Sequence, residues 1–130
     1  MNIELKEIDK DTLKVGDLVG VARPVRIGWY SQFRHLKICQ ATITRITPKR
    51  TKIETDQFGE HDKNEIFYEY DENAEKENEL AIMFEQFKYG RYELDDFDKE
   101  YGLDSIGDED LPEVAEHMKA ITEILKKYKE

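Results

Sequence analysis

Residues 13–22 read LKVGDLVGVA and residues 41–55 read ATITRITPKRTKIET, and these two stretches decide the fold. In both, apolar side chains alternate with polar or glycine residues, the pattern of a half-buried β-strand. The first stretch predicts a strand from about Leu18, and the second predicts a hairpin around the turn at Pro48. The alternation slips before Ile46, which predicts a β-bulge there.

The neighbouring segments complete the predicted sheet. Pro24 either ends the first strand or places it at a sheet edge. Residues 23–35 are expected to form a long connection to a second strand over residues 36–47, and residues 56–59 a turn in which glycine supplies positive φ. A fourth strand is predicted from the alternation of Ile66, Tyr68 and Tyr70. Four short strands and one long loop predict a small, strongly curved barrel.

Beyond residue 72 the spacing of apolar residues changes from two to about 3.6, which predicts helices. The first helix is expected to have Asn73 as its N-cap and to end at Gly90. Its expected apolar face consists of Leu80, Met83, Phe84 and Phe87. Residues 91–110 are acid-rich, with at most one short helix expected there.

A final helix is predicted to open at Asp110 and Pro112, because proline is tolerated in the first turn of a helix. Its apolar residues follow one another in steps of four and three, which predicts an amphipathic stripe. The stripe consists of Val114, Met118, Ile121, Leu125 and Tyr128. We interpret it as a face that packs into the core.

These patterns predict an α+β fold, with a basic barrel over residues 1–70 and an acidic helical region over residues 71–130 packed on it or appended to it. The pattern LKVGDLVGV, the long loop and the ATITRITPKRTKIET hairpin resemble SH3-like barrels, in particular those of small proteins from phages and mobile elements. The resemblance covers about residues 11–70. It implies a small SH3-like β-barrel followed by two or three helices, acting as an adaptor, a nucleic-acid binder or an inhibitor of host machinery.

The charge is distributed unevenly along the chain. The net charge is −10, yet residues 1–52 carry 11 Lys/Arg against 5 Asp/Glu, and residues 53–130 carry 9 against 25. The balance is therefore +6 in the first part and −16 in the second. Such asymmetry is typical of a protein with two surfaces for different partners, although two halves that pack together and offset each other would give the same pattern.

The compartment is expected to be the cytoplasm. Cys39 is the only cysteine, so no intramolecular disulfide can form, which favours a reducing environment. The first 14 residues mix acids and bases, unlike a signal peptide. No apolar run approaches the roughly 18 residues that span a membrane, so we expect no membrane partner.

The sequence favours a binding protein over an enzyme, with no catalytic residue and no cofactor. The three histidines are far apart in the sequence, and no zinc, phosphate-loop or nucleophile-elbow motif is present. Cys39 is interpreted as a structural thiol within a strand. Calcium-loop spacing fails as well, because the required glycine is replaced by Tyr101 or Leu103, so no metal site is predicted.

The acid-rich segment is the first candidate site. Eleven acids and one base, Lys99, lie within residues 93–116. Acids spaced along a folded surface can imitate the phosphates of a nucleic acid and compete for a basic groove. We therefore predict a non-enzymatic inhibitor that binds the basic surface of a host protein complex that handles nucleic acid. The expected partner-binding residues are Glu93, Asp95, Asp96, Asp98, Glu100, Tyr101, Asp104 and Asp108.

Two alternatives remain open. A nucleic-acid-binding accessory protein would combine cations for phosphates with flat rings for bases, as the residues Arg26, Trp29, Tyr30, Phe33 and Arg34 do. The same rings could instead cap one end of the barrel, and the net charge of −10 opposes direct nucleic-acid binding. The second alternative is an assembly subunit that self-associates through its C-terminal helix.

Overall fold

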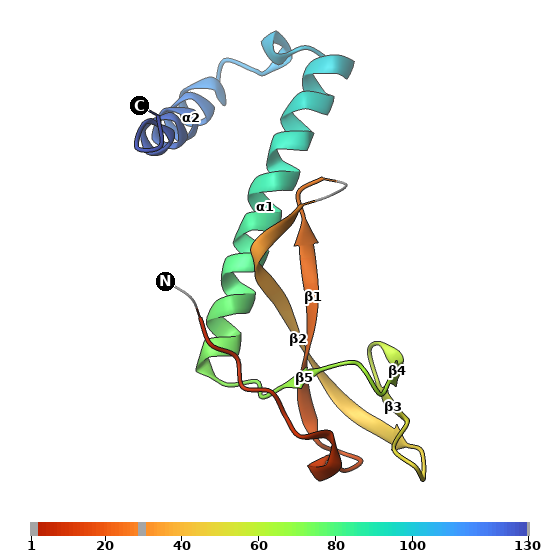
Figure 1. The fold of residues 1–130 in the computed structure, drawn as a ribbon. Coiled ribbons are helices and arrows are strands. Elements are labelled where there is room, and N and C mark those ends of the chain that lie inside the picture. Colours follow the sequence, from red (N-terminus) through yellow and green to blue (C-terminus); the bar gives the residue numbers. More distant parts are fainter. Residues whose placement is uncertain (1–2, 29–30, 130) are drawn as a thin grey trace. The chain divides into compact units, whose positions relative to one another are not determined.

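The computed structural model describes residues 3–28 and 31–129, and its fold is α+β, as predicted. An antiparallel sheet of five strands is followed by two helices, α1 (Glu72–Glu100) and α2 (Leu111–Lys126), drawn in Figure 1. The chain forms two compact units, Met1–Tyr89 and Gly90–Glu130, hereafter the sheet unit and the acidic unit. The division lies inside α1, whereas the sequence placed the boundary at residue 70.

The sheet has the strand order β4-β3-β2-β1-β5, so β4 and β5 are its edges. Within the described residues the ladder does not close on itself, and the predicted SH3-like barrel remains a prediction. The strands are β1 (Leu18–Arg26), β2 (Gln32–Ile46), β3 (Lys52–Thr55), β4 (Gly59–Asp62) and β5 (Phe67–Tyr68).

The long connection predicted over residues 23–35 is wrong, because β1 continues through Pro24 and β2 begins at Gln32. Pro24 lies opposite Leu36, whose N–H points away from β1 toward α1. The pair is therefore not hydrogen-bonded, and proline's missing N–H costs no bond of the β1–β2 ladder. Because β5 pairs with β1 only at Gly20 and Val21, Pro24 lies on a free edge. The edge position predicted for Pro24 is thus confirmed.

The later strands match the sequence in part. The predicted bulge is confirmed by a shift of register between Ile43 and Arg45, and Gly59 has the predicted positive φ, 68°. The fourth predicted strand shrinks to two residues, and its phase is wrong: Phe67 is fully buried while Ile66 is exposed. Phe67, and not Ile66, occupies the core position, where its ring packs edge-on against buried His61 with ring centroids 5.0 Å apart.

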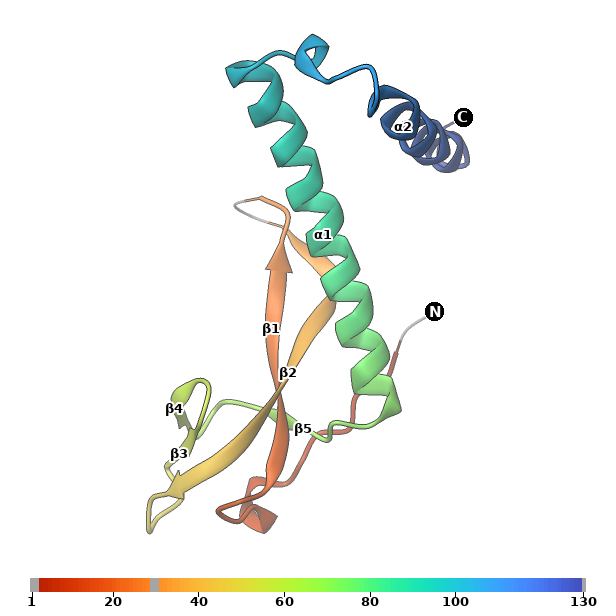
Figure 2. The ribbon, with the colours of Figure 1, turned by 180° about the vertical axis from the view of Figure 1, so that it is seen from behind.

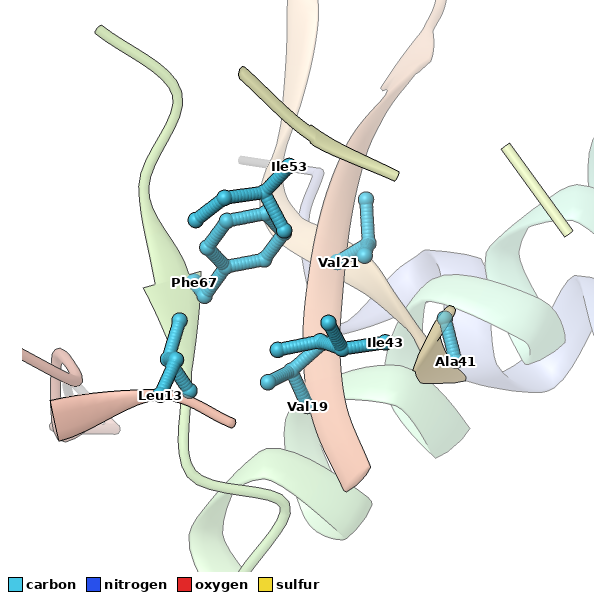
Figure 3. Close-up of a cluster of buried hydrophobic side chains, with 7 residues drawn as sticks. All are labelled: Leu13, Val19, Val21, Ala41, Ile43, Ile53 and Phe67. Carbon is cyan, nitrogen blue, oxygen red and sulfur yellow. The ribbon is translucent and has the colours of Figure 1, made fainter. Parts of the chain in front are cut away.

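The core of the sheet unit is small and aliphatic around one aromatic ring. Figure 3 shows Phe67 beside Ile53, with side chains of β1, β2 and the N-terminal segment gathered around them. A Cβ added to Gly20 would lie 2.8 Å from Ile38 Cγ2 and 3.1 Å from the carbonyl oxygen of Tyr68. Gly20 therefore permits the close approach of β5. The cluster consists of Leu13, Val19, Val21, Ala41, Ile43, Ile53 and Phe67.

The ends of α1 differ from those predicted. Asp71, not Asn73, caps its first turn, because the N–H of Ala74 donates to Asp71 Oδ1 at 2.9 Å. Gly90 lies in the helix interior, and the helix instead ends before Gly102, which has a φ of 83°. An interior glycine costs only about 1 kcal/mol relative to alanine, so it does not by itself end a helix.

The apolar face predicted for α1 is wrong except for Phe84, which is half-buried and stacks on Phe33 of β2. Leu80, Met83 and Phe87 are exposed, while the buried residues of the helix are Ala74, Glu77 and Ala81. Figures 1 and 2 both show the first half of α1 lying along β2. On the side of β2 that faces α1, the backbone N–H groups before the stretch that pairs with β3 have no strand partner. The helix therefore needs acceptors on its packing face more than it needs apolar side chains.

In the acidic unit, Asp110 precedes α2 and Pro112 lies in its first turn, as predicted. Within the acidic unit the stripe does not pack into a core: Val114 is half-buried and the other four stripe residues are exposed. Between residues 90 and 129, the part of this unit that the structure describes, no side chain is buried. Neither α1 nor α2 combines the length and the apolar composition that a membrane span requires, over the residues described.

Candidate functional site

The predicted partner-binding residues all lie in the acidic unit. Glu93, Asp95, Asp96, Asp98 and Glu100 occupy the last turns of α1, Asp104 lies in a short 3-10 helix, and Asp108 precedes α2. Figure 1 shows this segment as the cyan end of α1 and the chain that follows it. Each of the eleven acids of residues 93–116 is exposed, and these eleven side chains are hereafter the acidic surface.

The acids surround the end of α1 and do not form one stripe. At 3.6 residues per turn, Glu93, Asp96 and Glu100 share one side, and Asp95 and Asp98 share the opposite side. Two opposite sides of the helix therefore present negative charge, and Leu94 and Phe97 lie on the arc between Glu93 and Asp98. Only Phe97, which is half-buried, interrupts the polar surface over residues 95–100.

Few groups neutralise the acidic surface. Asp98 Oδ1 accepts the N–H of Leu103 at 3.2 Å, a bond that helps to end the helix. Within the described part of the chain, the one ion pair that includes any of the eleven acids joins Glu113 to His117 at 3.7 Å, and both side chains are exposed. The negative field of this unit is thus left open to solvent.

An aromatic pair accompanies these acids. The rings of Phe97 and Tyr101 lie 5.3 Å apart, and Tyr101 is 63% exposed. Tyr101 follows directly after the helix, with its N–H bonded to the carbonyl of Phe97 at 2.8 Å. Exposed tyrosine beside charge is typical of an interface anchor, because it supplies contact area at a low entropy cost.

Of the five residues of the alternative nucleic-acid surface, the structure describes three, and two of these are exposed. Arg26 and Arg34 are exposed, whereas Trp29 and Tyr30 lie outside the described residues. Phe33 stacks on Phe84 of α1, with ring centroids 3.9 Å apart and planes 6° apart, and the Arg34 guanidinium lies 5.0 Å from its centroid. The ring that was predicted to stack on bases is thus used to attach the helix.

Several bases of the sheet unit are paired with acids of the same unit. Lys37 donates to Glu85 at 3.0 Å, and this hydrogen bond raises the pKa of Lys37, outweighing the opposite effect of burial. The other pairs join β1 to the segment before β5, β2 to β3, and β3 to β4; they are Arg23–Glu65, Arg45–Glu54 and Lys52–Glu60. Four of the eleven Lys and Arg residues of residues 1–52 are thus paired with an acid of the sheet unit.

A buried polar chain in the sheet was not found from the sequence. His61 Nε2 lies 2.9 Å from Thr55 Oγ1, and His61 Nδ1 lies 3.1 Å from Glu65 Oε2, which pairs through Oε1 with Arg23. The contact at Nδ1 is close but poorly aligned for a hydrogen bond. This order of hydroxyl, imidazole and carboxylate is that of a nucleophilic triad, but Thr55 is 3% exposed. A hydroxyl so enclosed is not accessible to a substrate. The contact between Thr55 and His61 instead links β3 to β4.

The pKa of Glu65 shows how this cluster stabilises the fold. Burial raises the pKa of Glu65, but the hydrogen bond from Arg23 and the close contact with His61 together lower it by a larger amount, so the net shift is downward. The described residues hold no group of three or more His, Cys, Asp or Glu side chains placed to bind a metal ion. The only sequence signal for this cluster was the apolar–polar alternation that brings Thr55 and His61 to one face.

No protein-family model matches the chain, and comparisons with curated proteins and with solved structures find no match either.

Proposed function

We propose that this chain is a non-enzymatic inhibitor of the phage or mobile-element type, whose acidic surface takes the place of nucleic acid in a basic groove of a host protein complex. The SH3-like character of the sheet belongs to the same proposal and rests on the LKVGDLVGV and ATITRITPKRTKIET stretches. In this proposal the sheet unit is the scaffold and the acidic unit is the working surface.

One observation carries the proposal: the acids of the two units are used differently. In the sheet unit, Glu54, Glu60, Glu65, Glu77 and Glu85 pair with side chains or backbone donors of that unit. The eleven acids of the acidic surface stay exposed, and among the described residues only Glu113 lies in ion-pair distance of a basic side chain, that of His117. Unpaired like charges repel one another, so such a surface lowers stability unless a cationic partner offsets it.

The density of charge supports mimicry of nucleic acid. Residues 93–100 carry five carboxylates and one ammonium group, a net charge of −4. At 1.5 Å per residue they extend over about 10 Å, which gives one net charge per roughly 2.6 Å. This value lies between about 3.4 Å for one DNA strand and about 1.7 Å for the duplex. A groove built to bind phosphates therefore meets a field of similar strength.

Affinity capture from a bacterial lysate tests the proposal. The lysate is treated with nuclease and passed over the immobilised chain, and retained proteins are eluted with a salt gradient. We expect nucleic-acid-binding proteins to be retained and to elute as salt screens the contacts. We expect no retention by the triple variant Asp95→Lys, Asp96→Lys and Asp98→Lys.

The matched control reverses three exposed acids of the sheet unit, Glu7→Lys, Glu69→Lys and Glu79→Lys, with the same change in net charge. This control should retain the same proteins as the wild type. Equal loss in both triple variants would show that only the total charge matters. Undiminished retention by the acidic-surface variant would contradict the proposal.

A further inference from the structure

The stripe on α2 is an apolar face that no other described part of the acidic unit covers. Met118, Ile121 and Leu125 are 39, 37 and 41% exposed, and Tyr128 is 81% exposed. Steps of four and three residues place them on one side of the helix, with Val114 at its start. A helix of 16 residues is marginal in water by itself, so burial of this side is what would stabilise it.

The charges along α2 and the turn before it are divided between its two ends. The first half carries the acids Asp108, Glu109, Asp110, Glu113 and Glu116, with no Lys or Arg. The second half carries the bases Lys119, Lys126, Lys127 and Lys129, against Glu123 and Glu130. The exposed side chains of this helix thus form a negative end and a positive end, in the direction that also complements the helix dipole.

We propose that the stripe is covered by the α2 helix of a second copy of this chain, in antiparallel orientation. An antiparallel pair places the acidic half of each helix beside the basic half of the other. A parallel pair would place Lys126 and Lys127 beside their own copies, and like charges in such positions oppose association. The arrangement has two-fold symmetry, so the same stripe serves both partners.

The dimer is expected to be weak and reversible. Sixteen residues form a helix about 24 Å long. One pair of such helices buries less than the roughly 800 Å² per partner of a standard interface, so we expect dissociation in the micromolar range. Association must therefore be measured over a range of concentrations.

Sedimentation equilibrium of the full chain provides the first test. We expect the wild type to pass from monomer to dimer with rising micromolar concentration. Ile121→Asp, which places a charge in the stripe, should remain a monomer at every concentration. Ala120→Asp adds the same charge one residue away, on another side of the helix, and should dimerise like the wild type. Circular dichroism of both variants checks that the sheet unit is folded.

Cysteine crosslinking tests the orientation, in a Cys39→Ser background. Val114→Cys and Tyr128→Cys lie at opposite ends of the stripe. When the two variants are mixed and oxidised, an antiparallel pair gives disulfides between the different variants, which mass spectrometry distinguishes from those between identical chains.

Three results would overturn the inference: a monomeric wild type, a dimer that Ile121→Asp leaves unchanged, or disulfides formed only between identical variants. The two proposals share the acids of residues 108–116, but their tests are distinguishable, because Ile121→Asp keeps every acid of the acidic surface and the capture experiment reverses only Asp95, Asp96 and Asp98. Failure of the dimer therefore leaves the capture experiment fully interpretable.

Discussion

The Glu77 carboxylate of α1 lies 2.6 Å from Nδ1 of His35 on β2, and both side chains are buried. The second oxygen of Glu77 accepts the N–H of Leu36 at 2.9 Å. One turn of helix thus supplies acceptors along an open strand edge, because the neighbouring Asn78 accepts the N–H of Ile38 at 2.9 Å. The side chains of the helix take the place of a further strand.

Removing the Glu77 carboxylate should destabilise the sheet unit. Glu77→Ala leaves a buried imidazole and a backbone donor without an acceptor, and we expect a loss of about 3 kcal/mol. Glu77→Gln keeps one acceptor and should lose less. Urea unfolding measures both against Glu79→Ala, an exposed position where a change within about 0.5 kcal/mol is expected. Equal stability of Glu77→Ala and Glu79→Ala would show that the contact contributes nothing.

A methyl group at Gly20 should separate β5 from β1. Gly20→Ala places a Cβ within 3.1 Å of both Ile38 and the Tyr68 carbonyl, so overpacking should cost about 1–3 kcal/mol. Gly28→Ala is the control, because no atom of the described residues lies within 4 Å of the Cβ added there, its two chain neighbours aside. Thermal unfolding of the two variants distinguishes them, and equal midpoints would contradict the close packing of β5.

The sequence predicted what depends on local chemistry. The turn at Gly59, the bulge after Ile43 and the start of α2 at Pro112 each follow from one or two residues and their allowed backbone angles. These features could be found without knowledge of any tertiary contact.

The features that failed depend on what a segment packs against. The packing face of α1 was predicted from its apolar residues. The helix packs against a strand edge instead, where Glu77 and Asn78 accept backbone N–H groups and Leu80 stays exposed. Residues 23–35 were expected to form a long connection, but β1 continues through Pro24, because the side of the strand that Pro24 faces has no strand partner there. The exposed acids of the candidate site could be expected from charge density, whereas the His61 cluster needed the pairing of β3 with β4.

Protonation of Glu65 in acid should lower the free energy of unfolding. Its pKa is lowered from 4.5 in the fold, so between the folded and unfolded values the unfolded chain binds more protons. The contribution is therefore fully present above the unfolded value and lost as the pH falls through the folded one. Urea unfolding from about pH 7 to about pH 3 should show the advantage of the wild type over Glu65→Gln shrinking with acid. An advantage that is constant with pH would contradict the charged Arg23–Glu65 pair.

Phe33 is expected to contribute to the stability of the fold and not to nucleic-acid binding. Phe33→Ala removes the ring stacked on Phe84 and should cost about 2 kcal/mol. We expect no binding of single-stranded DNA by the wild type at physiological salt in fluorescence anisotropy, because the net charge of −10 opposes it. Micromolar binding that is lost in Arg34→Ala would favour the nucleic-acid-binding alternative.

Competition for a captured partner tests the central claim most directly. A protein retained by the immobilised chain is purified and loaded with a fluorescent nucleic acid that it binds, and the free chain is then added. The account predicts that the chain displaces the nucleic acid stoichiometrically, that rising salt weakens both complexes, and that the Asp95, Asp96 and Asp98 reversal displaces nothing. A stable complex that contains the partner, the nucleic acid and the chain together would contradict it.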